Sequence, residues 1–437
     1  MFDHYRGDNE PFTLKMWKPL VHVCRRWRYI VFGSPLRLHL RLVCDVRTPV
    51  RKLLNIWPPL PIIIRYSPNE DEGVGNVIDA LEHHHRISSI DFEGLTSHVL
   101  KRFITVMQEP LLVLTGLRLQ CSDDLGSAIP DTFLGGSAPQ LQILVLEGIA
   151  FPTFPGFVLP ATHLTKLQLQ KIPDAGYISP EVMVTCLSVL LELEELVIGF
   201  QSSHPISRDP PPLTRVILPA LTYFEFRGVR EYLEDLVARI ITPELHSLDI
   251  WFFLDLIFDI PQLRQFIHIT NTLRLCKRVC IELYPWSARI NVESPTPLHL
   301  GVKCERLDWQ VSSMAQLCNG LIPLLSEVEL LEVNGDPDLQ VESEEVDSRQ
   351  WLELFHPFTA VQDLYVSKKL GPLIARALTK NMVTEVLPSL QRLYLEGPNS
   401  SGAIQEVLAR FLAARHRPII VKRWEQDTHW DPEDDDQ

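Results

Sequence analysis

The chain has 437 residues, of which 46% are hydrophobic and 22% are charged, and its formal net charge is −14 at pH 7. This is the composition of a folded protein that is long enough for two or three ordinary domains or for one extended repeat array. The acidic balance argues against nucleic acid or a membrane surface as a partner, because both favour a surplus of basic residues.

The cysteines and the apolar stretches indicate an intracellular protein. The sequence contains eight cysteines, and no two of them form a CxxC pair, so neither a zinc ribbon nor a redox motif is predicted. The first residues do not resemble a signal peptide. The most apolar stretch, 250–260, contains two aspartates and is too short to span a bilayer. We therefore expect a protein of the cytoplasm or the nucleus.

The first predicted element is a helix that starts at Pro19 and ends before Gly33 and Pro35. Its apolar face consists of Leu20, Val23, Cys24, Trp27, Ile30 and Val31. The other face is basic. The plain structural interpretation is a cap over the core of the first strand. An amphipathic helix on a membrane surface is the disfavoured alternative, because the rest of the chain is acidic.

The same segment resembles part of a known motif. The run Val23-Cys-Arg-Arg-Trp-Arg28 is similar to the second half of an F-box, Val-Cys-x-x-Trp-Arg followed by apolar residues. The continuation, with Thr48-Pro-Val-Arg-Lys-Leu-Leu and Trp57-Pro-Pro-Leu-Pro, resembles the large fungal family of F-box proteins with leucine-rich repeats. The resemblance is good over about the first 66 residues and looser beyond them.

The resemblance implies a function. In that family the F-box helices dock on a Skp-type adaptor, and thereby on a cullin ligase, while the repeats hold the substrate. The implied adaptor contacts are Leu20, Val23, Cys24, Trp27, Arg28 and Ile30. A full F-box opens with a Leu-Pro-x-Glu-like helix, which residues 2–18 lack, and we hypothesise that the start is truncated. The alternative function is a repeat scaffold that binds a protein without any ligase.

The remainder of the chain follows a repeated pattern, L-x-x-L-x-L with other apolar residues allowed at the L positions. Clear copies start at Leu141, Leu164, Leu193, Leu221, Leu245, Val361 and Leu390, and weaker copies start at Ile87, Leu114, Cys276, Cys304 and Val328. Successive starts are 23 to 33 residues apart. This spacing brackets the roughly 20–29 residues of a leucine-rich repeat and extends somewhat beyond it.

The pattern predicts the fold class. The last two apolar positions of each copy are two residues apart and share one face of a short strand, whereas segments such as 181–191 have helical spacing. We therefore predict an α/β leucine-rich-repeat solenoid, with a parallel sheet on its concave side and helices outside. Further strands are expected near 36–42, 61–66 and 418–422, and further helices over 48–56 and 77–81. The predicted segments are 1–35 (F-box-like), 36–424 (solenoid) and 425–437 (acidic disordered tail).

The residue between the two paired apolar positions should point to the concave surface, where solenoids bind their partners. The predicted substrate-binding surface consists of Glu225, Asp249, Asp308, Glu332, Tyr365 and Tyr394. The acidic members suggest an unknown protein substrate that is basic, and tyrosine is frequent at interface hot spots. The alternative is that these residues are polar only because they are exposed to solvent.

Catalytic motifs are not evident, so we predict neither an enzyme nor a cofactor. The best metal candidate is His83-His84-His85, but consecutive helical residues point about 100° apart and cannot converge on one ion. Cys276 and Cys280 flank one repeat copy, where Cys276 should point inward and Cys280 toward the concave surface. They are interpreted as packing residues rather than as metal ligands.

Overall fold

The computed structural model describes residues 19, 21–33, 41–56, 59–67, 73–123, 128–202, 215–253, 258–270, 276–293, 297–322, 324–339, 346–380, 386–396 and 420–424. The chain divides into two compact units. Unit 1 comprises Met1–Pro205, Thr214–Leu221 and Ile240–Thr242. Unit 2 comprises Ile206–Leu213, Thr222–Arg239 and Pro243–Gln437.

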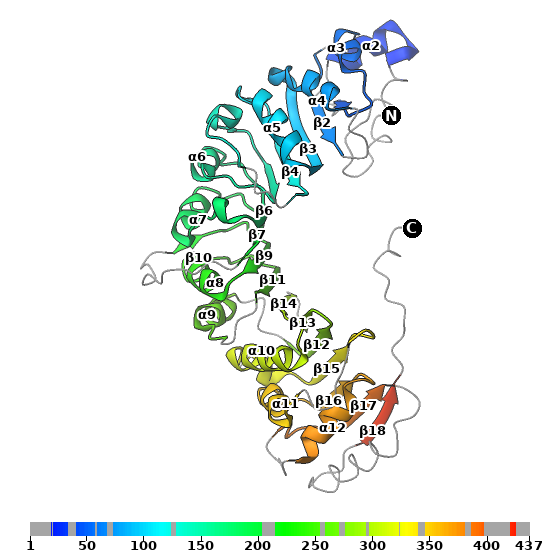
Figure 1. Cartoon of the computed structure of the whole chain (residues 1–437), viewed down its shortest axis with the longest axis vertical. Coiled ribbons are helices and arrows are strands. Elements are labelled where there is room, and N and C mark those ends of the chain that lie inside the picture. The colour runs from blue at the N-terminus through cyan, green and yellow to red at the C-terminus, as the bar shows by residue number, and fades with distance from the viewer. Residues whose placement is uncertain are drawn as a thin grey trace. The chain divides into compact units, whose positions relative to one another are not determined.

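The sheet of unit 1 is parallel throughout and follows the chain order (Figure 1). Its strands are β1 (Leu42–Cys44), β2 (Ile62–Tyr66), β3 (Ile87–Leu95), β4 (Gly116–Cys121), β5 (Ile143–Glu147), β6 (Lys166–Ile172) and β7 (Glu195–Phe200). The helices of this unit are α2 (Arg25–Gly33), α3 (Val50–Ile56), α4 (Val74–Leu81), α5 (Ser97–Val106), α6 (Phe154–Val158) and α7 (Pro180–Leu187). A second, two-stranded parallel sheet pairs β8 (Val216–Ile217) with β10 (Ile240–Ile241).

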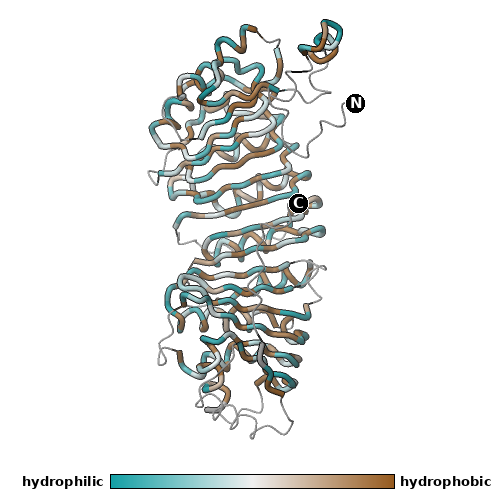
Figure 2. The backbone as a smooth tube through the Cα atoms, turned by 90° about the vertical axis from the view of Figure 1, so that its right-hand side faces the viewer, coloured by the Kyte–Doolittle hydropathy of each residue, from teal (hydrophilic) through white to brown (hydrophobic). Residues whose placement is uncertain are grey.

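The apolar spacing of the repeat places its leucines in register across the strands. Leu144 pairs with Leu167, and Leu167 pairs with Leu196, and all three side chains are buried. Helices cover this buried face of the sheet, and hydropathy alternates along the strands (Figures 1 and 2). Each copy therefore completes the core of its neighbour, which is how a repeat array is stabilised.

The sheet of unit 2 has the order β9, β11, β14, β13, β12, β15, β16, β17, β18. These strands are β9 (Tyr223–Gly228), β11 (Ser247–Phe252), β12 (Arg278–Tyr284), β13 (Ser287–Glu293), β14 (Leu298–Lys303), β15 (Leu330–Gly335), β16 (Asp363–Val366), β17 (Arg392–Glu396) and β18 (Ile420–Trp424). Its helices are α8 (Arg230–Val237), α9 (Pro261–Ile269), α10 (Leu307–Gly320), α11 (Ser348–Phe355) and α12 (Gly371–Lys380).

The predicted fold class is confirmed, with one departure. The strand β13 runs antiparallel to both β12 and β14, so the sheet of unit 2 is mixed rather than wholly parallel. The predicted helices near 48–56 and 77–81 correspond to α3 and α4, and the strands expected near 61–66 and 418–422 correspond to β2 and β18. Most of the strand expected near 36–42, and the whole acidic tail, lie outside the described residues.

The repeat copy predicted at Cys304 is wrong. Residues 307–320 form α10, and the strand of this region is β14, which lies just before it. The residues that match the pattern are Cys304, Leu307 and Trp309. Because Leu307 is buried and Trp309 is 37% exposed on α10, they do not share one face of a strand, and the match is a coincidence. None of the described helices is both long and apolar enough to cross a membrane.

Candidate functional site on the ladder face of unit 2

Alternate residues of the strands in unit 2 point to opposite faces of the sheet. On β11, Leu248, Ile250 and Phe252 are fully buried on the face that the helices cover, whereas Asp249 and Trp251 are half-buried on the other face. We call this other face the ladder face. Its central row, read across the strands in register, is Glu225, Asp249, His299, Asn291, Cys280, Glu332, Tyr365, Tyr394 and Lys422.

Five of the six residues predicted for the substrate-binding surface lie in this central row. The exception is Asp308, which lies in the first turn of α10, where it accepts a hydrogen bond from Arg306 at 2.7 Å. His299 and Asn291 lie in the row instead, because β13 and β14 are inserted between β11 and β12. The alternation in Leu298-His-Leu-Gly-Val302 was the signal that could have revealed β14.

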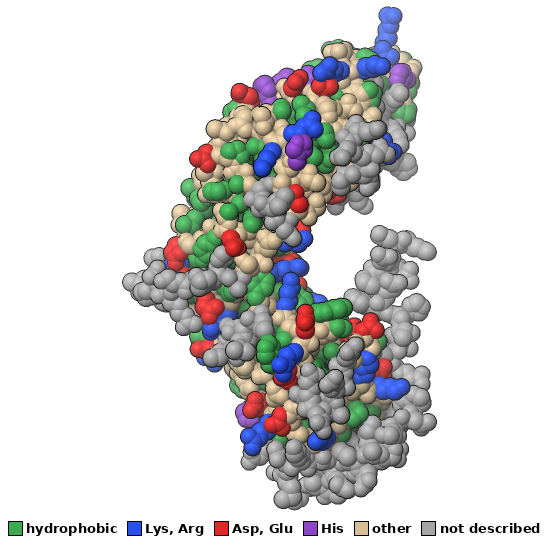
Figure 3. Space-filling model, viewed as in Figure 1, with side chains coloured by type: hydrophobic (Ala, Val, Ile, Leu, Met, Phe, Trp, Pro, Cys, Tyr) green, Lys and Arg blue, Asp and Glu red, His purple; other side chains and the backbone are tan. Residues whose placement is uncertain are grey.

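The acidic residues of the row are largely neutralised by arginines of the chain itself. Glu225 accepts hydrogen bonds from Arg227 Nε at 2.7 Å and from Tyr223 Oη at 2.8 Å. Glu332 accepts one from Arg278 Nη2 at 2.6 Å. Acidic and basic side chains are accordingly interspersed over unit 2 in the space-filling view (Figure 3). The row carries much less uncompensated negative charge than its sequence suggests.

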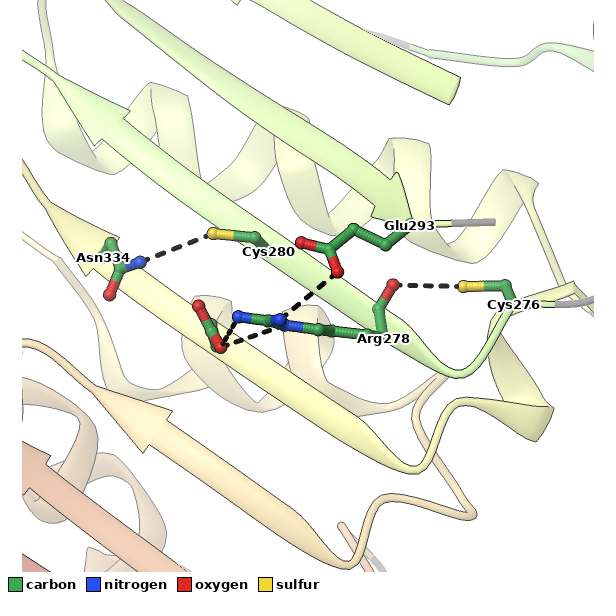
Figure 4. A network of polar contacts seen from close by, with 6 residues as sticks. Cys276, Arg278, Cys280, Glu293 and Asn334 are labelled. Atoms are coloured by element: carbon green, nitrogen blue, oxygen red, sulfur yellow. Dashed lines mark hydrogen bonds and ion pairs between the residues drawn. The ribbon is translucent and has the colours of Figure 1, made fainter. Parts of the chain in front are cut away.

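The middle of the face contains a polar network around β12 (Figure 4). Arg278 forms ion pairs with Glu332 and with Glu293, whose Oε2 is 3.4 Å from Arg278 Nη1. Asn334 Nδ2 donates to Cys280 Sγ at 3.4 Å, and Cys276 Sγ donates to the carbonyl oxygen of Arg278 at 3.3 Å. Burial raises the pKa of the Cys276 thiol to about 11, and burial, followed by Glu282, also raises the pKa of Cys280.

Toward β11 the ladder face carries an aromatic and a guanidinium group in contact. The Arg289 guanidinium carbon lies 5.8 Å from the centroid of the Trp251 ring. Between their strands is Gly301, and a Cβ atom at that position would lie 2.4 Å from Trp251 Cε3. The indole ring can therefore lie across β14 only because residue 301 has no side chain, and this brings the ring to Arg289.

The titratable groups beside this pair have shifted pKa values. Burial raises the pKa of Asp249, while the Arg289 charge partly offsets that rise. Burial and Arg289 together lower the pKa of His299 to about 4. The Nδ1 atom of His299 lies 2.8 Å from Asn291 Oδ1, and a neutral imidazole satisfies this contact by donating its Nδ1 proton.

At the other end of the row, Tyr365 and Tyr394 are stacked in parallel, with ring centroids 4.1 Å apart. Lys422 Nζ lies 5.9 Å from the Tyr394 centroid. Both tyrosines are half-buried, and Arg392 forms an ion pair with Asp363 in the neighbouring row. This end of the face is therefore a preordered aromatic surface.

The row contains the residue types of a cysteine hydrolase without their arrangement. Asn291 lies between His299 and Cys280 in register, and it is Asn291 that contacts His299. Because the Cys280 thiol has a raised pKa, it is held in its unreactive protonated form. The described residues also contain no group of three or more His, Cys, Asp or Glu that could hold a metal ion.

The predicted adaptor contacts lie on and before α2. Val21 and Val31 are buried, whereas Val23 is 61% exposed and Ile30 is 46% exposed. This differs from the predicted buried cap, and the helix is interrupted at Cys24. Trp27 is half-buried, and Arg28 Nε donates to the carbonyl oxygen of Val21 at 3.0 Å. Leu20 lies outside the described residues.

The repeated strand–helix units and their register define the class of protein as an α/β repeat solenoid of the leucine-rich type. No protein-family model matches the chain, and no curated protein matches it in sequence. Among solved structures, the chain is similar to the leucine-rich repeat-containing protein LegL7 from Legionella pneumophila. That similarity has a TM-score of 0.28 and 11% sequence identity, and it covers 80% of this chain and 96% of that chain.

Proposed function

We propose that this chain is a repeat scaffold that binds a protein partner on the ladder face of unit 2. The observation that carries the proposal is the composition of that face, where half-buried Trp251, Arg289, Tyr365 and Tyr394 lie on rigid strands. Tryptophan, tyrosine and arginine are the residues that most often dominate binding at interfaces. Solenoids generally bind their partners on such extended strand surfaces.

The test is partner capture from cell extract with matched variants. The double substitution Tyr365→Ser and Tyr394→Ser is expected to abolish capture of a partner that the wild type retains. The control is Leu191→Ser, which changes a side chain of unit 1 that is 56% exposed. A partner lost equally from both variants, or from neither, would contradict the proposal.

The basic character expected of the partner has its own matched pair of variants. Asp249 lies on the ladder face and Asp308 lies on α10. If a basic segment binds the face, Asp249→Asn weakens capture and Asp308→Asn does not. Equal effects would remove the charge argument and would leave the aromatic surface as the basis of binding.

A more specific role is supported by the segment formed by α2 and the residues just before it. We propose that the scaffold serves as the substrate-recognition subunit of a Skp–cullin ubiquitin ligase inside the cell. The F-box-like residues Val23 and Ile30, as well as Cys24, are exposed rather than packed into the core. Exposed apolar side chains on a short helix are available to an adaptor. The repeat scaffold without a ligase remains the alternative function.

The test of the ligase role is binding of the full chain to a Skp-type adaptor. Ile30→Asp is expected to abolish binding, because it places a charge on the apolar surface that the adaptor would cover. Leu112→Asp is the control, since Leu112 is 66% exposed elsewhere in unit 1. Failure of the folded wild-type chain to bind would favour the scaffold without a ligase.

A further inference from the structure

Arg289 is a half-buried cation without an ion pair or a hydrogen bond to any described residue. Its Nε atom is buried, and its guanidinium lies against the Trp251 ring. Glu282 is directly opposite in register, but its Oε2 accepts from Asn291 at 2.7 Å. A buried donor that lacks an acceptor destabilises a fold, so this guanidinium has hydrogen-bonding capacity left for an external group.

Unused acceptors lie on the same face. Asp249 Oδ1 on β11 and Asn334 Oδ1 on β15 are both buried without a hydrogen-bond partner among the described residues. Arg289 lies between their strands, on β13. Across five neighbouring strands the face therefore has an unpaired acceptor on Asp249, an unpaired donor on Arg289 and a second unpaired acceptor on Asn334. A ligand that satisfies all three must itself carry both hydrogen-bond donors and hydrogen-bond acceptors.

The local charges select among such ligands. Asp249 and Glu282 flank Arg289, and neither is within ion-pair distance of a described basic group. A carboxylate brought to Arg289 would be repelled by both of them, whereas a neutral carbonyl oxygen would not. A peptide group has a neutral acceptor and a donor close together, and the Trp251 ring offers apolar contact to the side chains beside it.

We propose that the Trp251–Arg289 pair binds the main chain of an extended, non-acidic polypeptide segment of the partner. This rests on the proposed function and specifies its ligand. A main-chain carbonyl of the segment accepts from Arg289, and its N–H groups donate to Asp249 and Asn334. The stacked tyrosines 365 and 394, farther along the same row, contact side chains of the partner beyond that segment.

The experiment selects random dodecapeptides displayed on phage against the full chain and measures the affinity of the enriched peptides. Arg289→Met, which keeps the aliphatic length against Trp251, is expected to weaken binding about 30-fold, as at an interface hot spot. Arg118→Met is the matched control, because Arg118 is an exposed arginine of a parallel strand in unit 1. Replacing single amides of the peptide by esters is expected to weaken binding at least tenfold at one or two positions.

Three outcomes would overturn the proposal: no enriched linear peptide, affinity unchanged by Arg289→Met, or binding that requires an Asp or Glu of the peptide. The proposed function is judged separately by partner capture. A partner that Arg289→Met retains and that the Tyr365/Tyr394 variant loses contradicts the peptide site alone. A partner that both variants retain contradicts the ladder face as the binding surface altogether.

Discussion

The sheet of unit 1 and the centre of the sheet of unit 2 use the same apolar spacing but differ in strand direction. Every neighbouring pair from β1 to β7 is parallel, whereas β13 is antiparallel to β12 and β14. Parallel neighbours need a long crossover connection, while antiparallel neighbours need only a short turn. Unit 2 therefore adds strands to its sheet without a helix between them.

The two regions also differ in what they carry at equivalent positions. In unit 1 the row contains Val145 and Val197, which are 4% and 0% exposed, and these alternate with the polar residues Arg118 and Gln168. In unit 2 the row contains Asp249, His299 and Asn291, with polar contacts between strands. The repeat thus determines the helix-covered face, whereas the opposite face varies from strand to strand. In unit 2 its three neighbouring polar residues Asp249, His299 and Asn291 are brought together by the hairpin that β13 and β14 form.

The largest expected effect is on the attachment of the hairpin to α10. Gln310 is fully buried, and its Nε2 donates to the carbonyl oxygens of Tyr284 at 2.8 Å and of Cys304 at 2.6 Å. Gln310→Ala leaves both carbonyls without this donor. We expect a loss of about 3 kcal/mol in the free energy of unfolding, measured by urea denaturation.

The control for this prediction is Gln108→Ala in unit 1. Gln108 Nε2 donates to the Ile104 carbonyl oxygen within its own helix turn and is only part-buried, so the expected loss is below about 1 kcal/mol. If both variants lose the same free energy, strand pairing alone holds the hairpin and the two regions are equally robust.

The regular region was predictable because each copy repeats one constraint. Leu144, Leu167 and Leu196 follow the same spacing, so a strand wrongly predicted in one copy can be recognised from the copies beside it. The hairpin has no second copy. Its strands β13 and β14 alternate over only six or seven residues each, and the Cys304 pattern beside them imitates the repeat while forming a helix.

The site was predictable in position but not in chemistry. Alternation places Glu225, Asp249 and Glu332 on the correct face. The pairing of Glu332 with Arg278 depends on which strands are neighbours, which the sequence pattern does not specify, whereas Glu225 pairs with Arg227 two residues along the same strand. The contact of Trp251 with Arg289 also depends on Gly301, a residue that the repeat pattern does not distinguish from any other.

The substitution Gly301→Ala is expected to have the next largest effect on stability. The new methyl group would overlap the Trp251 ring, so the ring must move away from β14 and from Arg289. Overpacking of this kind destabilises by about 1–3 kcal/mol, and the moved indole is expected to shift the tryptophan fluorescence maximum.

Gly156→Ala in α6 of unit 1 is the matched control for Gly301→Ala. A Cβ atom at position 156 meets nothing within 4 Å. Alanine in a helix is expected to be stabilising by about 0.5–1 kcal/mol. The two glycine substitutions should therefore change the free energy of unfolding in opposite directions. An unchanged fluorescence spectrum for Gly301→Ala would show that the Trp251 position does not depend on this glycine.

The pH dependence of stability should depend on His299. Its pKa is about 4 in the folded state, against roughly 6.5 when unfolded, so only the unfolded chain binds the proton between these values. Stability contributed by this residue is thus present above pH 6.5 and lost as the pH falls to about 4. Wild type should lose about 1–2 kcal/mol more than His299→Gln over this range, after solvent screening. Urea denaturation of both proteins across this pH range measures the difference.

The smallest expected effect on the free energy of unfolding comes from replacing Asp249, and Asp123 of unit 1 provides the comparison. Burial raises the pKa of Asp249, so its contribution to stability is present at low pH and is lost as the pH rises through the folded-state pKa. Asp249→Asn should therefore stabilise the chain at pH 7, by less than about 1 kcal/mol, with the gain disappearing in acid.

In unit 1, hydrogen bonds from Ser97 at the start of α5 lower the pKa of Asp123, so Asp123→Asn should destabilise the chain at pH 7, again with the difference disappearing in acid. Urea denaturation at pH 7 and in acid measures both. If Asp249→Asn also destabilised the chain at pH 7, the charge of Arg289 and the hydrogen bond from Trp251 would be stabilising the Asp249 carboxylate by more than its burial costs.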